Sequence, residues 1–283
     1  MTSLPHNKND RVVKGFGEEW SRFTQRELLP DERQAIFEDY FSIFSWDTLP
    51  VNASGADIGC GSGRWAMLVA PLVGELHLVD ASAAALDVAR RNLDRAGNVR
   101  FHHASVDELP FAEGSLDFAY SLGVLHHVPD TLAALRSVAR VLKPGAPLLV
   151  YLYYAFDNRP QWFRALWRLS DWIRRVISRL PVRPRNAVCD VIAVTVYWPL
   201  ARLAKVLDGF GLLPTAWPLA AYRDRSFYTL RTDALDHFGT RIEQRFTRTE
   251  IEAMLRAGGF DGIRFSDRLP YWCAVGVKAG YRT

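Results

Sequence analysis

Residues 55–65, Gly-Ala-Asp-Ile-Gly-Cys-Gly-Ser-Gly-Arg-Trp, have the composition and spacing of a site for a charged small molecule. Glycines at 59, 61 and 63 remove the Cβ atoms where the backbone must bend sharply, so a ligand can approach the main chain closely. Asp57 precedes them at the expected carboxyl end of a short strand. Because nucleotide-like ligands bind at that end of an open α/β sheet, the stretch predicts a ligand-binding turn.

A second acid, Asp80, ends the next expected strand. A carboxylate there can accept hydrogen bonds from both hydroxyl groups of a ribose. A dinucleotide site would use the same acid, but its fingerprint needs glycines at relative positions 1, 3 and 6. Arg64 occupies the sixth position, where a large side chain would keep helix and strand apart, so the sequence argues against a dinucleotide.

Strands and helices alternate along the chain around this turn. Leu148–Tyr153 is continuously apolar, as a strand covered on both faces should be, and Ser82 and Asp130 can cap helices. The alternation predicts an α/β fold with a parallel sheet. The expected strands are 53–56, 76–80, 99–105, 116–121 and 148–153, with helices over 65–73, 82–97 and 130–142.

Residues 1–50 precede the turn and are expected to form a helical cover. Within them, apolar residues of Asp31–Ser45 recur with helical spacing. Trp20 and Phe23 stand among glycines and charges, where they either pack on the sheet edge or form a wall of the ligand pocket. The helical stripe consists of Ile36, Phe37, Tyr40, Phe41 and Phe44.

The alternation stops after the fifth strand. It resumes at a capping box formed by Thr247 and Glu250, and residues 263–266 and 272–277 would finish the sheet as a hairpin. We therefore expect a core made of 51–154 and 246–283. Residues 155–245 are expected to be a helical insertion that acts as a substrate lid.

In order and spacing, these motifs resemble the class I S-adenosylmethionine-dependent methyltransferases. The likeness is to the methyltransferase type 11 branch, which includes ubiquinone and menaquinone biosynthesis enzymes. It covers about residues 53–154 and, more loosely, 246–279. The matching segments are Asp57–Gly63, Val79–Ser82, Leu109–Phe111, Gly114–Phe118, Leu125–Asp130 and Val141–Gly145.

The resemblance implies a Rossmann-like fold, with a mostly parallel seven-stranded sheet, a C-terminal antiparallel hairpin strand and a helical insertion after the fifth strand. It also implies S-adenosyl-L-methionine as cofactor and S-adenosyl-L-homocysteine as product. By the same resemblance, Asp57 and the turn backbone would bind the methionine amino and carboxylate groups, and Asp80 the ribose hydroxyls. The implied cofactor-binding residues are Asp57, Gly59, Cys60, Gly61, Gly63, Asp80, Ala81, Ser105, Val106, Asp107, Leu122 and Gly123.

Within that set, Ser105, Val106 and Asp107 would meet the adenine edge, and Leu122 and Gly123 would line the methionine arm. This branch often has an acid for the adenine amino group where the chain has Ser105. Asp107 or the backbone is therefore expected to substitute. No metal site is expected.

Methyl transfer from a sulfonium needs a positioned nucleophile, exclusion of water and, for some acceptors, a base. His126 and His127 follow the fourth strand, and histidine suits proton removal near neutral pH. Either imidazole could instead fix the loop. Tyr153 and Tyr154, at the end of the fifth strand, complete the catalytic candidates. Sugar-modifying relatives can carry an acid where this chain has Leu152. Because the acid is missing here, we expect either an acceptor that needs little deprotonation or a catalytic base supplied by the insertion.

The insertion begins with an amphipathic helix pattern over Pro160–Leu180, with an apolar stripe and arginines mostly off it. A basic, tryptophan-bearing helix fits a lid with a solvated back, which we favour, or peripheral membrane contact through 160–180. The arginines could instead meet a phosphate. A second helix over Asn186–Leu207 is expected to break at Pro199. The candidate substrate-contacting residues are Trp20, Phe23, Trp162, Tyr197, Tyr228 and His237.

The composition, 49% hydrophobic and 23% charged in 283 residues, is that of a globular chain. Residues 155–185 hold eight Arg and two Asp of a chain with net charge +4, so the basic patch is local and no nucleic acid partner is expected. The longest nearly apolar run, Val191–Ala201, is too short to span a bilayer. Three scattered cysteines and a polar N-terminus favour the cytoplasm, or peripheral attachment at the inner face of its membrane. The oligomeric state stays open.

We therefore expect an S-adenosylmethionine-dependent methyltransferase. Its acceptor would be an O, N or C atom of a small, partly hydrophobic metabolite, such as a lipid-linked, isoprenoid, polyketide or glycan precursor. The alternative is a catalytically silent cofactor-binding protein that acts as a membrane-associated or assembly partner.

Overall fold

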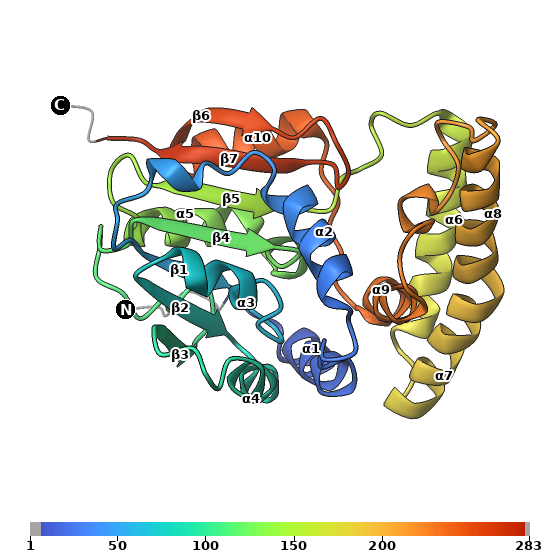
Figure 1. Ribbon diagram of the computed structural model, residues 1–283, viewed down its shortest axis with the longest axis horizontal. Helices are drawn as coiled ribbons and strands as arrows, with labels where there is room; N and C mark the ends of the chain where they lie inside the picture. Colours follow the sequence, from blue (N-terminus) through green and yellow to red (C-terminus); the bar gives the residue numbers. More distant parts are fainter. Residues whose placement is uncertain (1–6, 281–283) are drawn as a thin grey trace. The chain divides into compact units, whose positions relative to one another are not determined.

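The computed structural model describes residues 7–280. It contains one seven-stranded sheet (Figure 1). The strands lie in the order β3-β2-β1-β4-β5-β7-β6. β7 runs antiparallel to β5 and β6, and the other neighbours pair in parallel, so the expected fold class is confirmed. The strands are β1 Ser54–Ile58, β2 Glu75–Asp80, β3 Val99–His103, β4 Phe118–Leu122, β5 Pro147–Tyr151, β6 Phe260–Phe265 and β7 Cys273–Lys278.

The strand order reverses at β1, with β2 on one side and β4 on the other. Such a switch point opens a crevice at the carboxyl ends of the strands, because the connecting helices leave in opposite directions. In the register of the sheet, Asp57 lies opposite Leu78 of β2 and Tyr120 of β4. Asp57 therefore stands at the centre of the sheet, one residue before the end of β1.

Side-chain caps start several of the helices around the sheet. The Asp130 carboxylate accepts the Ala133 N–H at 2.9 Å, and Ser82 caps its helix in the same way. Thr247 and Glu250 form the expected capping box. The helices are α1 Asp10–Arg22, α2 Pro30–Phe41, α3 Ala66–Val69, α4 Ala83–Asn92, α5 Thr131–Val141 and α10 Arg248–Ala257.

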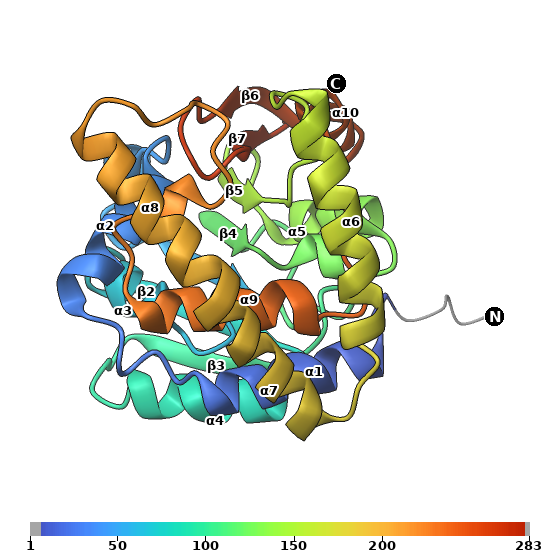
Figure 2. The same ribbon diagram turned by 90° about the vertical axis from the view of Figure 1, so that its right-hand side faces the viewer.

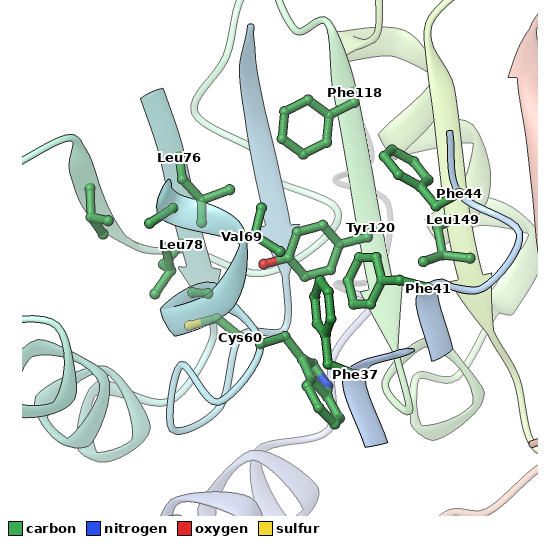
Figure 3. Close-up of a cluster of buried hydrophobic side chains, with 14 of the residues drawn as sticks. Phe37, Phe41, Phe44, Cys60, Val69, Leu76, Leu78, Phe118, Tyr120 and Leu149 are labelled. Atoms are coloured by element: carbon green, nitrogen blue, oxygen red, sulfur yellow. The ribbon is translucent and has the colours of Figure 1, made fainter. Parts of the chain in front are cut away.

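Aromatic rings from α2 and the residues after it pack on the sheet (Figure 3). Phe41 meets Tyr120 edge-on with ring centroids 5.3 Å apart, and Phe44 meets Phe118 at 6.1 Å. All four side chains are buried. The apolar stripe expected for 31–45 is thus the contact between this helix and β4.

The chain divides into two compact units. Unit one comprises the residues up to Gln25, Gln34–Ala155 and those from Ile242 onward; unit two comprises Arg26–Arg33 and Phe156–Arg241. The segment 26–33, expected in the N-terminal cover, belongs to unit two. The reason is Glu32, whose carboxylate accepts the Ser226 N–H at 2.9 Å and the Thr229 hydroxyl at 2.7 Å where α9 (Phe227–Gly239) begins.

Unit two is helical, with α9 at its centre. Both α6 (Gln161–Ile177) and α7 (Val182–Ile192) pack on α9, and the two views place them on the same side of it (Figures 1 and 2). The remaining elements are the π-helical η4 Ala193–Tyr197, α8 Trp198–Gly209 and the short 3-10 helix η5 Ala220–Tyr222.

The break expected at Pro199 does not occur. α7, η4 and α8 form one continuous helix over Val182–Gly209. In a regular α-helix the proline ring would clash with the carbonyl group four residues earlier, and the π-helical turn η4 shifts the register there. The 28-residue helix is long and apolar enough to cross a membrane, which corrects the estimate from the shorter apolar run; 28% of its most apolar window is buried.

Gly55 offers a test of the packing of β1 against β4. A Cβ atom at this position would overlap the ring of Phe118, which is fully buried, whereas a Cβ at Gly97 meets nothing within 4 Å. We expect Gly55→Ala to lower the free energy of unfolding by about 2 kcal/mol in urea denaturation. Gly97→Ala is the matched control and should change it by less than about 0.5 kcal/mol. Equal effects of the two substitutions would contradict this packing.

Candidate functional site

The glycine turn after β1 has the backbone geometry that only glycine adopts easily. Gly59, Gly61 and Gly63 have φ angles of +79°, +54° and +74°. The Gly59 and Cys60 N–H groups both donate to the Val79 carbonyl, at 2.8 and 3.1 Å, so the turn is held against the end of β2. Residue types at these positions are therefore set by the fold of the turn.

Asp80 connects the turn to the helix that follows β2. Its carboxylate accepts the Gly61 N–H at 2.9 Å and the Ser82 N–H at 2.8 Å. Burial raises the pKa of Asp80, while these two N–H groups act in the opposite direction. The carboxylate lone pairs that these bonds do not use can accept hydrogen bonds from the hydroxyl groups of a ligand.

Asp57 is a buried carboxyl group beneath the same turn. Its Oδ2 atom has no hydrogen-bond partner among residues 7–280. Burial raises its pKa to about 8; the neighbouring Tyr120 hydroxyl, which is not placed for a well-formed hydrogen bond, and Arg64 offset part of the rise. A buried carboxyl group with unused hydrogen-bonding capacity is suited to binding a cation.

One cavity in unit one opens beside the turn, with a volume of about 970 Å³ including its solvent-open mouth. Eight of the twelve expected cofactor-binding residues line it, and they come from four successive strand ends. These are Gly59, Cys60, Asp80, Ala81, Ser105, Val106, Leu122 and Gly123.

The other four expected residues lie outside the lining. Gly63 packs against α4, where a Cβ would meet Leu93 at 2.8 Å, so its role is helix packing. Gly61 lies against the Trp20 indole, and Asp57 lies beneath the turn. Asp107 accepts hydrogen bonds from the Asn7 N–H at 3.0 Å and from the Ser105 hydroxyl, so its carboxylate oxygens are engaged within the protein.

Helix α1 forms one wall of the cavity, and most of the residues in that wall were not among the predicted site residues. Trp20 lines the cavity, together with Val12, Val13 and Phe16 from preceding turns. Phe23 is buried elsewhere and does not line it. The signal was present in the sequence, because 12, 16 and 20 share one helix face.

The two histidines after β4 have different surroundings. His127 lines the cavity, and its Nδ1 lies 2.6 Å from the Ile242 carbonyl oxygen. A carbonyl can only accept, so Nδ1 carries the proton and Nε2 carries the lone pair. His126 is fully buried outside the lining, and its Nδ1 accepts the Tyr153 N–H at 3.4 Å.

Burial therefore determines the charge of His126. It lowers the pKa of His126 well below its usual value, with His127 acting in the same direction, so the ring is neutral. The ring stacks on Tyr153 at 3.8 Å. His126 thus holds the end of β5, whereas His127 alone of the four catalytic candidates lines the cavity. Tyr153 and Tyr154 do not line it.

Residues 242–246, the return segment, cross the ends of β4 and β5. The Gln244 N–H donates to the His126 carbonyl at 3.1 Å, and the Phe246 N–H to the Tyr153 carbonyl at 2.9 Å. The Ala155 N–H in turn donates to Phe246 at 2.9 Å. No local pattern predicted this segment, since these backbone partners are distant in sequence.

The remaining substrate candidates belong to unit two. Trp162 is 54% exposed, and the buried Tyr197 packs against Tyr222 with ring centroids 5.9 Å apart. His237 forms a hydrogen bond with the Ser170 hydroxyl at 3.1 Å. With Tyr228, their assignment to a substrate site stays a prediction.

Comparison with known proteins agrees with this geometry. Residues 56–150 match the family described as a methyltransferase domain. The uncharacterized methyltransferase YcgJ of Bacillus subtilis is 38% identical over 104 residues, which are 36% of this chain and 41% of that protein. The demethylmenaquinone methyltransferase of Bacillus licheniformis is 31% identical over 104 residues, 36% of this chain and 45% of that protein.

The chain thus spans less than half the length of these curated relatives. A solved methyltransferase–activator complex from Haloferax volcanii contains a chain of the same fold, with TM-score 0.54 and 14% identity over 95% of this chain and 99% of that one. S-Adenosyl-L-methionine is the cofactor that goes with this domain. Residues 56–150 are thus similar to the methyltransferase domain of class I S-adenosylmethionine-dependent enzymes on the ubiquinone–menaquinone-like branch.

Proposed function

We propose that the protein is an enzyme that transfers the methyl group of S-adenosyl-L-methionine to an O, N or C atom of a small, partly hydrophobic acceptor. One observation carries this proposal. The glycine turn, Asp80 and His127 all line the same cavity, so a site for the cofactor and a candidate base share one space.

The residues present suit this cofactor. Asp57 would be the charge partner of the methionine ammonium group: its buried Oδ2 has no hydrogen-bond partner among residues 7–280, and it lies just outside the cavity lining. Asp80 would accept from the ribose hydroxyls, and Ser105 with Val106 would meet the adenine edge. When bound, the cofactor supplies a methyl group on an electrophilic sulfonium, so the protein need only position the acceptor and remove a proton where required.

We assign proton removal to His127. Its Nδ1–H is held by the Ile242 carbonyl, so in the neutral ring the buried Nε2 would be the atom that accepts a proton from an acceptor hydroxyl or amine. The neutral His126 ring beside it, at 4.0 Å between ring centroids, adds no positive charge to the site. His126 and the return segment are then positioning residues.

The acceptor class follows from the apolar part of the lining. Val12, Val13 and Phe16 of α1 and Val124 and Val128 beyond β4 give the cavity hydrophobic walls. We propose a lipid-linked, isoprenoid, polyketide or glycan precursor, with the insertion as its lid. The demethylmenaquinone named for one relative fits this range. We place the protein in the cytoplasm, peripherally at the inner face of its membrane.

Cofactor binding is tested by calorimetry with S-adenosylhomocysteine. Replacing Asp80 by Ala removes the ribose acceptor, so we expect roughly 100-fold weaker binding. Asp94→Ala, an exposed acid in the same unit, is the matched control and should bind like the parent. Equal affinities for parent and Asp80→Ala, with folding of both verified by circular dichroism, would contradict the assignment.

Asp57 makes binding depend on pH. Its carboxyl, with a pKa of about 8, is mostly protonated at pH 7 without ligand. An ammonium group favours the ionised form, so binding should release about one proton, and affinity should rise as pH approaches 8. Calorimetry in buffers of different ionisation enthalpy measures that proton. Asp57→Asn should abolish the release; a release that persists in this variant would assign the proton elsewhere.

Replacing His127 by Asn separates the rate of methyl transfer from the affinity for the cofactor. Asn can keep the donor to the Ile242 carbonyl but lacks the base, so labelled-methyl transfer into a cell extract should fall by about 10²–10⁴-fold. S-Adenosylhomocysteine affinity should stay within about twofold, because His127 is not among the cofactor contacts. Transfer at the parent rate would remove His127 as base. Cofactor binding with no transfer by the parent into any extract or lipid fraction would favour the silent alternative.

A further inference from the structure

Large exposed hydrophobic side chains are concentrated in unit two. Nineteen such side chains are exposed among residues 7–280, and all but Val51 and Leu72 belong to unit two. Scattered exposed hydrophobics are normal on a soluble surface, but a contiguous group marks an interaction site.

Helix α6 has its polar and apolar faces reversed relative to a soluble helix. Asp171 and Arg174 are buried, joined at 2.7 Å, and Arg174 also donates to the Thr240 carbonyl at 2.7 Å. Trp172 and Val176 are 65% and 53% exposed. The predicted stripe is therefore an outer face rather than the contact with the rest of the unit. Its exposed members are Trp162, Leu166, Leu169, Ile173 and Val176, and Trp172, outside the predicted stripe, is exposed as well.

The continuous helix α7–η4–α8 is also reversed, because it buries small side chains and exposes large apolar ones. Small residues Cys189, Ala193, Ala201 and Ala204 are buried, spaced three, four or eight apart along one face. Most of the larger apolar side chains are on the outside, although Tyr197 is buried. The exposed ones are Val191, Val194, Val196, Trp198, Leu203, Val206 and Phe210.

The polar side chains of this helix are bound within unit two. Asp190 pairs with Arg231 at 3.1 Å, and Arg202 donates to the carbonyls of Arg223 and Arg225 at 2.9 and 2.5 Å. These bonds hold one side of the helix on the rest of the unit. A helix held along its side presents one face to an apolar medium, as a surface-lying helix does, whereas a spanning helix is surrounded by it.

Charge indicates what covers this face. Residues 156–241 contain fourteen Arg or Lys and seven Asp or Glu, a net charge of +7. On α6 the exposed Arg168 and Arg175 lie seven residues apart, so they border one edge of the apolar stripe, and the exposed Arg179 follows in the turn after the helix. Exposed tryptophans beside arginines match the boundary between acyl chains and anionic headgroups.

We propose that the outer faces of α6 and α7–η4–α8 form a lipid-binding face, which lies in the interface of an anionic bilayer with its apolar side chains inserted. This inference deepens the proposed function and rests on it for the acceptor: the enzyme takes a lipid-soluble acceptor from the bilayer. The lipid class is recognised by negative headgroup charge, with Arg168 and Arg179 as contacts.

Vesicle flotation of the purified full chain tests the proposal. We expect it to float with vesicles of phosphatidylcholine and phosphatidylglycerol, to float weakly with phosphatidylcholine alone, and to lose binding as salt is raised. Trp172→Glu with Val176→Glu should weaken partitioning at least about tenfold, because two charges replace inserted side chains. Arg168→Gln with Arg179→Gln should weaken it roughly tenfold on anionic vesicles only.

Matched controls come from unit one. Leu72→Glu, at a side chain 54% exposed, and Arg95→Gln, at an exposed arginine, should leave flotation unchanged. The proposal would be overturned if the chain floated with neither kind of vesicle. Equal losses of flotation in the control variants would also overturn it. A dimer in sedimentation that Trp172→Glu dissociates, without flotation of the parent, would assign the face to a second copy. Lipid-free calorimetry with S-adenosylhomocysteine reports the proposed function separately.

Discussion

A buried carboxyl group at the centre of the sheet is the constraint on which the site depends. A pKa of about 8 means that ionising Asp57 costs on the order of 5 kcal/mol more inside the protein than in water. The sheet tolerates the group because it can stay neutral until a cation arrives. The glycine turn directly above it lines the cavity through Gly59 and Cys60, and under the proposed function the two features would serve the same end of the cofactor.

What could be predicted from sequence was local. The turn, Asp80, the helix caps and the order of the strands follow from spacing within short windows, and all of them are in the structure. The return segment could not be predicted, since Ile242 meets His127 across more than a hundred residues. Likewise, periodicity revealed the stripe on α6 but could not say which medium it faces, because a stripe has the same spacing whether it meets protein or lipid.

The histidine pair shows how two adjacent residues of one type acquire different functions. The main chain sets the difference: a carbonyl oxygen faces one Nδ1 and an N–H faces the other. The tautomer of His127 places the lone pair on its Nε2 atom, and burial keeps the His126 ring neutral. From the sequence His-His alone neither tautomer could be assigned, which is why both stood as catalytic candidates.

The chain leaves the core at Ala155 and returns through residues 242–246, and these two ends are hydrogen-bonded to each other. Everything between them could be exchanged for another sequence without altering the pairing of β5, because the closing bonds belong to the core itself. Under the proposed function, the cavity for the methyl donor stays with the sheet, while a different inserted segment could bring a different acceptor. One cofactor domain can thereby acquire new chemistry by recombination at a single point on its surface.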